Sequence, residues 1–300
     1  MDIHQLRVFC SVYKNRSFSK ASRELLLSQP TISDHIKSLE EALDSRLFDR
    51  LGRSIAPTKE SATLYPRAVE LIEKLDAIKS DINLGRAEPS GELLLGASSM
   101  PGSFLIPRAA ASFKLLYPEV SFRLVVRESK AITNMVIEHE LPVGIVGAVM
   151  ERKSLEFTFL SSDDLILVCA DGIVQAGSIR PAELPRLPFV VRQEGSGTKL
   201  TADRYFINNG VPAGKLNVAA SFNSNAAMVE AIKAGLGAGV LPRMYASREL
   251  EKGTIREIKI KGLKMRQNFY IMALRKRTIP GVLKLFLDHL KTTASGLKPA

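Results

Sequence analysis

The chain has few cysteines and no long apolar run. Only two cysteines, Cys10 and Cys169, occur in 300 residues, and both lie in apolar patterns. This excludes a disulfide framework and favours a reducing compartment. No stretch approaches the roughly 18 consecutive apolar residues that a membrane span needs, and the segment from Met1 to Arg7 lacks the basic start and apolar continuation of a secretory signal. We therefore expect a cytoplasmic protein with no membrane partner.

Metal-binding and catalytic motifs are also scarce. The four histidines, His4, His35, His139 and His289, have neither HxH nor HExxH spacing, which argues against a metal site. The glycine-rich run at 235–239 follows a predicted helix and precedes a predicted strand, which is the wrong order for a dinucleotide-binding loop. No Ser-His-Asp arrangement stands out. We expect no cofactor, no metal, no catalytic residues and no enzymatic activity.

The net charge of +11 is distributed unevenly. Residues 1–90 hold 14 Lys and Arg against 13 Asp and Glu, whereas residues 248–300 hold 13 against 4. A basic excess attracts polyanions without specificity, and here it lies at the far end of the chain from the most DNA-like pattern. Charge alone therefore does not locate a nucleic-acid site.

The first 65 residues contain the pattern of a helix-turn-helix unit. Apolar residues recur at helical spacing over 2–14, and Ser17 can cap a second helix that runs to about Leu26. Ser28 can cap a third helix, with Pro30 in the first turn, where a proline loses no hydrogen bond. Three short helices with tight connections in this order are typical of a helix-turn-helix unit.

The polar face of the third helix suits the major groove of DNA. The N-terminal residues of such a helix reach base edges, and lysine suits phosphate. Any surface helix has a polar face, so periodicity alone does not separate this function from an ordinary exposed helix. Residues 49–58 then predict a two-stranded wing with a basic tip, although an ordinary hairpin has the same pattern. The residues that we expect to bind DNA are Ser28, Gln29, Pro30, Thr31, Ser33, Asp34, Lys37, Arg50 and Arg53.

The pieces SFSKASRELLLSQPTISDHIKSLEEAL and RLFDRLGRSIAPT closely resemble LysR-type transcriptional regulators. The resemblance implies a winged helix-turn-helix, binding to double-stranded DNA, and contact with RNA polymerase. The sequence departs from the family pattern at Asp44 and Ser61, where glycine is usual, and at Asp34, where relatives often have Arg or Gln. An acid at this position can accept a hydrogen bond from cytosine N4, so the base preference can differ while the fold is kept.

Residues 59–87 predict one long linker helix. Its apolar residues are spaced alternately four and three apart, which is the seam of a left-handed helix pair. The alternative is a helix packed only on its own domain. The resemblance implies an antiparallel linker-helix dimer, often assembled into a tetramer, so we expect a homodimer or homotetramer. The residues of this seam are Leu64, Ala68, Leu71, Leu75, Ile78 and Ile82.

From Glu92 onward, strands and helices alternate, which predicts an α/β architecture. The resemblance implies two Rossmann-like lobes of the periplasmic-binding-protein type, with an effector in the cleft. We place lobe one at about 91–161 plus 267–300 and lobe two at about 162–266. The expected strands are 93–97, 122–126, 143–146, 165–169, 189–191, 218–221, 239–241 and 269–273, and the expected helices lie near 103–117, 129–140, 198–209, 224–235 and 280–293. The expected domains are thus a DNA-binding domain at 1–58, a linker and hinge at 59–90, and an effector-binding domain at 91–300.

Three polar loops, 98–102, 192–199 and 222–225, each follow a predicted strand and open a predicted helix. Each alone is a helix-capping loop, but ligands collect where several meet at the carboxyl ends of strands. Their hydroxyl groups and free backbone amides suit an anion. The motifs RQEGSGTK and SSMPGSFLIP are similar to the RExGSGTR and SSxPGxxLLP of one LysR-type subgroup, with Lys199 in place of the usual arginine. The residues that we expect to bind the effector are Ser98, Ser99, Gly147, Glu194, Ser196, Thr198, Phe222 and Asn223.

The sequence therefore predicts a DNA-binding transcriptional regulator that responds to a small, anionic effector. Two alternatives stay open. The lobes also suit a solute-binding module, although the N-terminal pattern argues against it. They also suit a cytosolic enzyme, although the loops offer no general base beyond Glu194.

Overall fold

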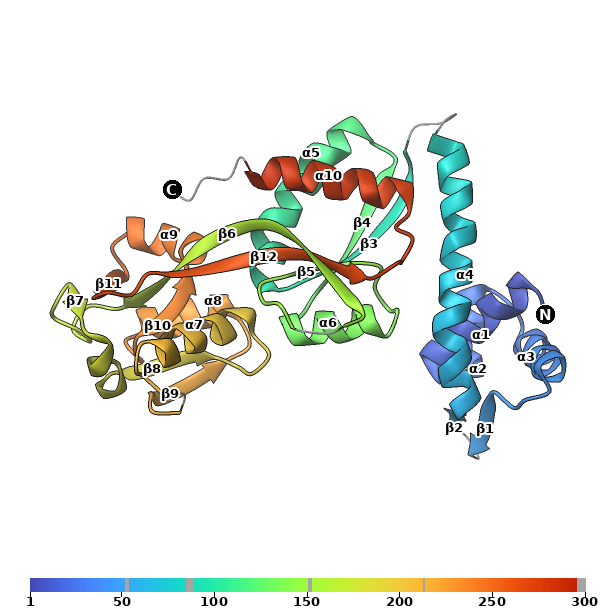
Figure 1. Ribbon diagram of the computed structural model, residues 1–300, viewed down its shortest axis with the longest axis horizontal. Coiled ribbons are helices and arrows are strands. Elements are labelled where there is room, and N and C mark those ends of the chain that lie inside the picture. Colours follow the sequence, from blue (N-terminus) through green and yellow to red (C-terminus); the bar gives the residue numbers. More distant parts are fainter. Residues whose placement is uncertain (52–53, 85–88, 151–152, 213, 296–300) are drawn as a thin grey trace. The chain divides into compact units, whose positions relative to one another are not determined.

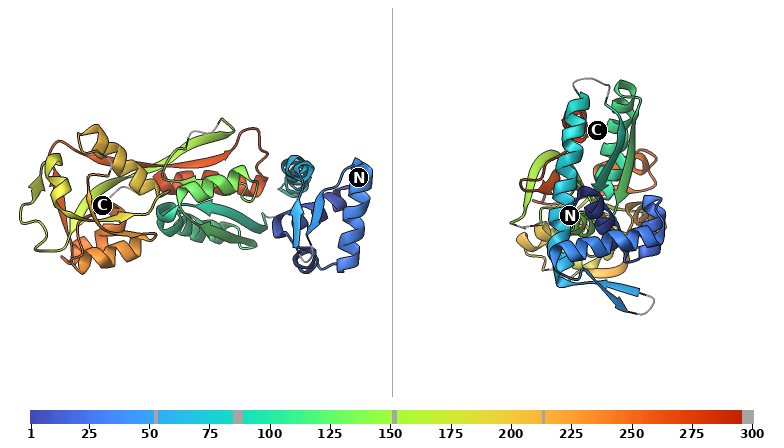
Figure 2. Two further views of the ribbon diagram at one scale, coloured as in Figure 1. Left: turned by 90° about the horizontal axis from the view of Figure 1, so that it is seen from below. Right: turned by 90° about the vertical axis from the view of Figure 1, so that its right-hand side faces the viewer.

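The computed structural model describes residues 1–51, 54–84, 89–150, 153–212 and 214–295 (Figure 1). The chain divides into two compact units. One comprises Met1–Ala87 and Lys276–Gly281, and the other comprises Glu88–Arg275 and Val282–Ala300 (Figure 2). In the ranges that the structure describes, no helix is both long enough and apolar enough to span a membrane.

The first unit contains the predicted helices, wing and linker helix. Its elements are α1 (Ile3–Asn15), α2 (Phe18–Leu25), α3 (Gln29–Leu43), β1 (Phe48–Leu51), β2 (Ser54–Pro57) and α4 (Lys59–Leu84). Ser17 and Ser28 cap α2 and α3 as predicted, by accepting the amide hydrogens of Lys20 and Thr31. β1 and β2 pair antiparallel and form the wing. The linker helix, predicted over 59–87, is observed to Leu84, and residues 85–87 lie outside the described residues.

One apolar core joins α1, α2, α3 and the start of α4. Phe9 and Phe48 lie with their ring centroids 5.8 Å apart, and Tyr13 stacks on Tyr65 of α4 at 4.2 Å. Ile32 and Leu39 bury the inner face of α3 completely. The opposite face of α3 stays outside this core, and its polar residues are exposed or half-buried.

The second unit is a two-lobed α/β structure. Its strands are β3 (Gly91–Ala97), β4 (Val120–Val126), β5 (Gly144–Val146), β6 (Leu155–Cys169), β7 (Ser178–Ile179), β8 (Pro188–Arg192), β9 (Asn217–Phe222), β10 (Gly239–Pro242), β11 (Arg256–Ile260) and β12 (Met265–Leu274). Its α-helices are α5 (Ile106–Leu116), α6 (Ser129–Ile137), α7 (Gly197–Asn208), α8 (Asn225–Lys233), α9 (Arg243–Glu251) and α10 (Gly281–Ser295).

Two long antiparallel strands, β6 and β12, run through both lobes (Figure 1). They belong to a sheet of order β4-β3-β5-β12-β6-β11-β7, in which β10 also pairs with β6. The parallel strands β3, β4 and β5 with α5, α6 and α10 make lobe one, and β7 to β11 with α7, α8 and α9 make lobe two (Figure 1). A separate parallel pair, β8 and β9, carries the loops that open α7 and α8.

Several predictions for the second unit were incomplete. The strand expected at 165–169 begins at Leu155, because the polar run through Ser161 and Asp163 is held by pairing with β12 rather than by an alternating apolar face. The helix expected from about 103 opens with a π-helical turn, Pro101–Leu105, before α5. α9 was not predicted, because only one of its residues, Ala246, is buried and the segment lacks an apolar face.

Candidate functional site

The exposed start of α3 carries most of the predicted DNA-binding residues. The Ser28 hydroxyl accepts the amide hydrogen of Thr31 at 3.2 Å and lies 2.7 Å from the Thr31 hydroxyl. The side chain of Gln29 accepts a hydrogen bond from Ser19 of α2 at 3.0 Å. These contacts orient the first turn of α3 against α2. Gln29, Pro30, Asp34 and Lys37 are exposed, whereas Thr31 and Ser33 are half-buried.

The wing is tied to α3 by hydrogen bonds that the sequence did not reveal. A carboxylate oxygen of Glu40 accepts the amide hydrogens of Leu47 at 2.6 Å and of Phe48 at 3.2 Å. From the other side, the fully buried hydroxyl of Ser61 donates to the Leu47 carbonyl. Arg50 belongs to β1, but its side chain and the whole of Arg53 lie outside the described residues.

Two departures from the LysR-type pattern have local structural consequences. Asp44 ends α3 in left-handed backbone, with φ 47°, where glycine carries no steric penalty. Ser61 occupies a completely buried position at which its hydroxyl finds the Leu47 carbonyl as a partner. Asp34, the third departure, is exposed on the outer face of α3.

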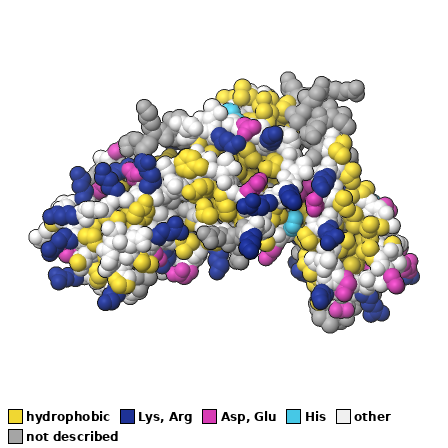
Figure 3. Space-filling model, viewed as in Figure 1, with side chains coloured by type: hydrophobic (Ala, Val, Ile, Leu, Met, Phe, Trp, Pro, Cys, Tyr) yellow, Lys and Arg dark blue, Asp and Glu magenta, His cyan; other side chains and the backbone are white. Residues whose placement is uncertain are grey.

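The predicted seam of α4 divides into a buried and an exposed part. Ala68 is only 1% exposed, because the first turns of α4 pack on the core of their own unit. Leu71, Leu75 and Ile78 are 49%, 41% and 55% exposed, and apolar side chains line this stretch of α4 in Figure 3. The side chain of Ile82 lies outside the described residues. The row of Leu71, Leu75 and Ile78 is called the open seam below.

In the second unit, three predicted effector-binding residues belong to one hydrogen-bond network. The Ser98 hydroxyl, at the end of β3, accepts the amide hydrogen of Gly147 at 3.1 Å. Gln267 of β12 donates to the Gly147 carbonyl at 2.9 Å and accepts from the Thr198 hydroxyl at 3.2 Å. A side chain on Gly197 would meet the Gly147 backbone at 2.9 Å, so glycine is needed where α7 approaches lobe one. Gln267, which connects the lobes here, was not predicted.

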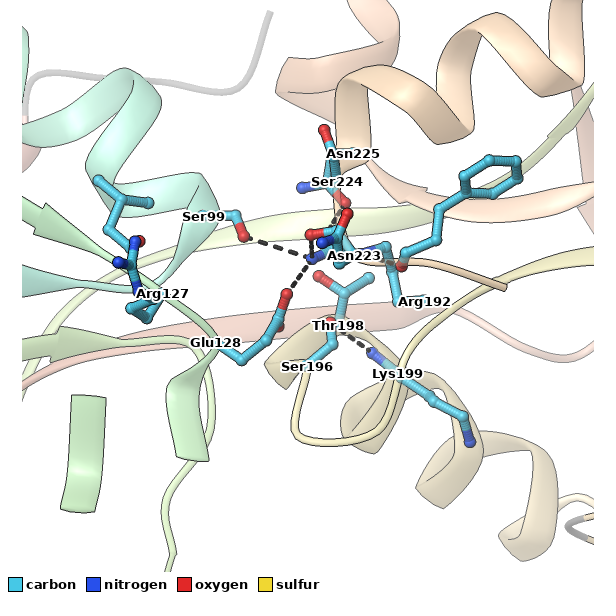
Figure 4. Close-up of polar contacts among 12 residues, drawn as sticks. Ser99, Arg127, Glu128, Arg192, Ser196, Thr198, Lys199, Asn223, Ser224 and Asn225 are labelled. Atoms are coloured by element: carbon cyan, nitrogen blue, oxygen red, sulfur yellow. Dashed lines mark hydrogen bonds and ion pairs between the residues drawn. The ribbon is translucent and has the colours of Figure 1, made fainter. Parts of the chain in front are cut away.

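A second group of polar contacts centres on Arg192, at the end of β8, whose side chain is 2% exposed (Figure 4). It donates to the carbonyl oxygens of Phe222 at 3.2 Å and Asn223 at 2.9 Å, and to the side-chain oxygen of Asn225. Across the cleft, it donates to Glu128 at 2.5 Å and to Ser99 at 3.4 Å. Arg192 thus joins both lobes. It opens the RQEGSGTK motif, which was the signal that should have included it among the predicted residues.

The predicted residues do not all face one cavity. Ser98, Ser99, Ser196 and Thr198 line a small cavity with Arg192. Phe222 and Asn223 contribute backbone carbonyls to Arg192, and Ser196 also caps α7. This cavity, called the cleft cavity below, is lined by Ser98, Ser99, Met100, Glu128, Arg192, Ser196, Gly197, Thr198, Gln267 and Phe269.

Lys199 and Glu194 are directed to each other instead. The side chain of Glu194 is 84% exposed and lies 3.1 Å from the Lys199 ammonium, which also contacts Asp203 at 2.6 Å. Partial burial lowers the pKa of Lys199, but hydrogen bonds to Asp203 and Glu194 outweigh it and raise the pKa above the ordinary value. In Figure 4, the Lys199 side chain points away from Arg192. Lys199 is therefore held as a cation outside the cleft cavity.

One further buried acid lies on the crossover strand β6. Asp163 is 2% exposed, and one of its carboxylate oxygens accepts the amide hydrogen of Met244, at the start of α9, at 3.1 Å. Burial raises the pKa of Asp163, although the bond to the Met244 amide opposes this effect. Asp163 therefore links the crossover strand to lobe two through a hydrogen bond. Its carboxyl group is costly to ionise because it is buried.

Two family models match this architecture. The model described as "LysR substrate binding domain" matches residues 86–295, and the model described as "Bacterial regulatory helix-turn-helix protein, lysR family" matches residues 3–62. Among related sequences, the HTH-type transcriptional regulator YeiE of Escherichia coli is 26% identical over 288 residues, with 96% of each chain covered.

Solved structures have the same fold. Full-length OxyR from Pseudomonas aeruginosa matches with a TM-score of 0.78 at 16% identity, covering 100% of this chain and 96% of that one. The regulatory domain of CcmR from Synechocystis matches with a TM-score of 0.63 at 22% identity, covering 69% of this chain and 99% of that domain. These matches confirm the predicted fold class: a winged helix-turn-helix, a linker helix and a two-lobed effector domain. The chain belongs to the LysR family of DNA-binding transcriptional regulators.

Proposed function

We propose that this regulator responds to a small anionic effector bound in the cleft cavity. The observation that carries the proposal is Arg192, a cation that is 2% exposed and lines a cavity shared by both lobes. The N-cap residues of α6, α7 and α8 are Glu128, Ser196 and Ser224, and all three lie close to this cation (Figure 4). Helix N-termini and a buried guanidinium both favour a negatively charged ligand.

Binding of a small molecule agrees with the fold. The CcmR domain, which is similar to this chain in structure, was solved in complex with 2-PG. At 22% identity this similarity concerns the fold alone, so the choice of an anion rests on the residues of this chain. We propose that Ser98, Ser99, Ser196 and Thr198, with Arg192 added, line the effector site. Gly147, Phe222 and Asn223 stay in the proposed set through their backbone contacts, whereas Glu194 pairs with Lys199 outside the cleft cavity.

A thermal-shift screen of small carboxylates and oxyanions tests the effector proposal. A ligand that binds only the folded state stabilises it by mass action, so the unfolding temperature should rise with ligand concentration. Alanine at Ser99 or Thr198 should reduce this shift while DNA binding is kept. Loss of DNA binding in these variants would mean instead that the loops are only structural.

For the DNA-binding half, we propose that α3 enters the major groove and that the wing contacts the backbone or minor groove. The proposed contacts are Ser28, Gln29, Pro30, Thr31, Ser33, Asp34, Lys37, Arg50 and Arg53. The exposed polar face of α3 supports this assignment. The full chain should shift a duplex of its own upstream region with an affinity that falls steeply as salt rises. Binding that is absent or insensitive to salt would contradict the proposal.

The open seam supports a proposal about how copies of the chain assemble. Three exposed apolar residues on one face of α4 favour pairing with a second copy, so we propose a homodimer, or a homotetramer built from such pairs. We further propose three domains, at 1–58, 59–90 and 91–300. We also propose that the protein acts in the cytoplasm, that it acts by binding and not by catalysis, and that it contacts RNA polymerase.

A further inference from the structure

The cleft cavity already holds a carboxylate. Glu128 stands immediately before α6 in lobe one, and its carboxylate oxygen lies 2.5 Å from a terminal nitrogen of Arg192 in lobe two (Figure 4). The two side chains are 15% and 2% exposed. Because water reaches this ion pair so little, its electrostatic interaction is screened far less than that of a surface pair.

The other contacts of Arg192 are neutral. Its remaining acceptors are two carbonyl oxygens, the Asn225 side-chain oxygen and the Ser99 hydroxyl. Among the described residues, Glu128 is the one carboxylate in an ion pair with Arg192. The charge of the buried guanidinium is therefore balanced by a group that belongs to the opposite lobe.

Two buried donors, one on the residue that follows Glu128 and one on a residue that contacts Arg192, make no hydrogen bond within the described residues. The Ser129 hydroxyl is completely buried, and the Asn225 side-chain nitrogen belongs to a residue that is 2% exposed; neither makes a hydrogen bond within the described part of the chain. The Asn225 oxygen accepts from Arg192, so the amide nitrogen must be the free donor. Buried donors of this kind carry a desolvation penalty that an additional acceptor would relieve.

We propose that Glu128 is a tethered competitor for the effector. Its carboxylate occupies the place on Arg192 that an anionic group of the effector takes, and effector binding displaces it. Displacement breaks the ion pair that joins the two lobes, so ligand binding is coupled to how the lobes are held together. This inference rests on the proposed function of the cleft cavity as the effector site.

The competitor also restricts the class of ligand. A carboxylate held on the chain acts at a high effective concentration, on the order of millimolar or above. A ligand with one charge and no other contact competes poorly against it. The ion pair therefore favours a carboxylate or oxyanion with additional acceptor oxygens over a ligand with a single charge.

Chemical rescue tests the competitor directly in the full chain. Glu128→Ala leaves Arg192 buried and unbalanced, and the unfolding temperature should fall by about 5–10 °C. About 100 mM sodium acetate, at constant ionic strength, should restore at least half of this loss, whereas neutral acetamide should restore none. The wild-type chain should respond little, because its own carboxylate holds the place.

The matched control is Glu257→Ala. Glu257 pairs with Arg243 at 2.8 Å in lobe two, and neither residue lines the cleft cavity. Acetate should not rescue this variant beyond its effect on the wild-type chain. Equal acetate shifts in all three proteins would overturn the proposal.

If Glu128→Ala does not fold, Glu128→Gln carries the test, because it keeps the volume and a hydrogen-bond acceptor without the charge. By titration calorimetry, inorganic sulfate should bind this variant at least about tenfold more tightly than the wild-type chain. An unchanged or weaker affinity would overturn the proposal.

Gel shifts with the upstream duplex separate this inference from the proposed function. Rescue by acetate in proteins that do not bind DNA would count against the proposed regulator and in favour of the competitor. Proteins that bind DNA but show neither rescue nor tighter sulfate binding would overturn the competitor alone.

Discussion

The Glu40 carboxylate, near the end of α3, lies 2.6 Å from the backbone nitrogen of Leu47, at the entry to the wing. The same oxygen accepts from Phe48, so one side chain fixes the path between the proposed recognition helix and the wing. The N–H groups of Leu47 and Phe48, two residues of the buried core, both donate to this oxygen. Leaving buried donors unpaired costs free energy of folding. The position of the wing relative to α3 therefore depends on a residue that need not touch DNA itself.

Glu40→Ala should destabilise the protein by about 1–3 kcal/mol, since it leaves both amides without this partner. Glu40→Gln, which keeps an acceptor oxygen, should lose clearly less. Glu41→Ala is the control, because Glu41 is exposed and its side chain forms a surface pair with Lys37 at 3.7 Å, worth under about 1 kcal/mol. Urea unfolding of the three variants checks the order, and equal losses for Glu40→Ala and Glu41→Ala would contradict it.

Replacing Asp44 is expected to stabilise the protein, whereas replacing Glu40 is expected to destabilise it. It adopts φ 47° at the end of α3, and its backbone N–H bonds to the carbonyls of Glu40 and Glu41. Glycine populates this left-handed region without the Cβ clash, so Asp44→Gly should stabilise the protein by about 0.5–1 kcal/mol. Glu41→Gly, inside the same helix, should destabilise it by about 1 kcal/mol. A loss of stability in Asp44→Gly would show that its side chain contributes more than the backbone strain costs.

Local signals made the first unit predictable. Ser17 and Ser28 are caps, and Pro30 lies in a first helical turn, where proline is favoured, so each marks a helix start from neighbouring residues alone. The wing followed from a short stretch of sequence in the same way. Glu40 was missed because a glutamate near the end of a helix usually faces solvent, and nothing in the pattern shows that it turns back to a strand.

The cleft was harder to predict because its key contacts join distant segments. Glu128 and Arg192 are 64 residues apart, and Thr198 and Gln267 are 69 apart. The loops were found as helix starts, but which side chain turns inward depends on how β6 and β12 bring the lobes together. Glu194 was chosen for its place in a motif, yet its side chain is mostly exposed and pairs with Lys199, while Arg192, two residues earlier, is buried.

Asp163 predicts a pH effect on stability. Burial raises its pKa above the ordinary value of 3.8, so the folded chain holds this proton more tightly than the unfolded chain. As pH rises from 3.8 through the raised pKa, the unfolded state loses the proton first, and the folded state loses stability across that range. Asp163→Asn stays neutral and keeps an oxygen for the Met244 amide, so at pH 7 its unfolding temperature should be higher by about 2–4 °C.

The comparison for this prediction is the neighbouring Asp164→Asn. The Asp164 side chain is 41% exposed and pairs with Arg266 at 3.2 Å, so its replacement should not produce the same gain. The advantage of Asp163→Asn over the wild-type chain should grow with pH across the titration range and then level off. An advantage that is constant at every pH would mean that ionisation of Asp163 is not its cause.

The open seam of α4 predicts a change in assembly. Leu75 lies between Leu71 and Ile78 on one face of the helix and is 41% exposed, so a charge there would not disturb the core of its own unit. Leu75→Glu should place like charges near each other in a paired helix and shift the protein toward monomer, as measured by light scattering. Because two half-sites must be held together for tight binding, its affinity for the upstream duplex should fall by about tenfold or more.

Lys74→Ala, which removes a surface pair with Glu70, is the control and should leave the mass and the affinity for DNA near those of the wild-type chain. An unchanged mass for Leu75→Glu would locate the dimer contact elsewhere, even if DNA binding weakened.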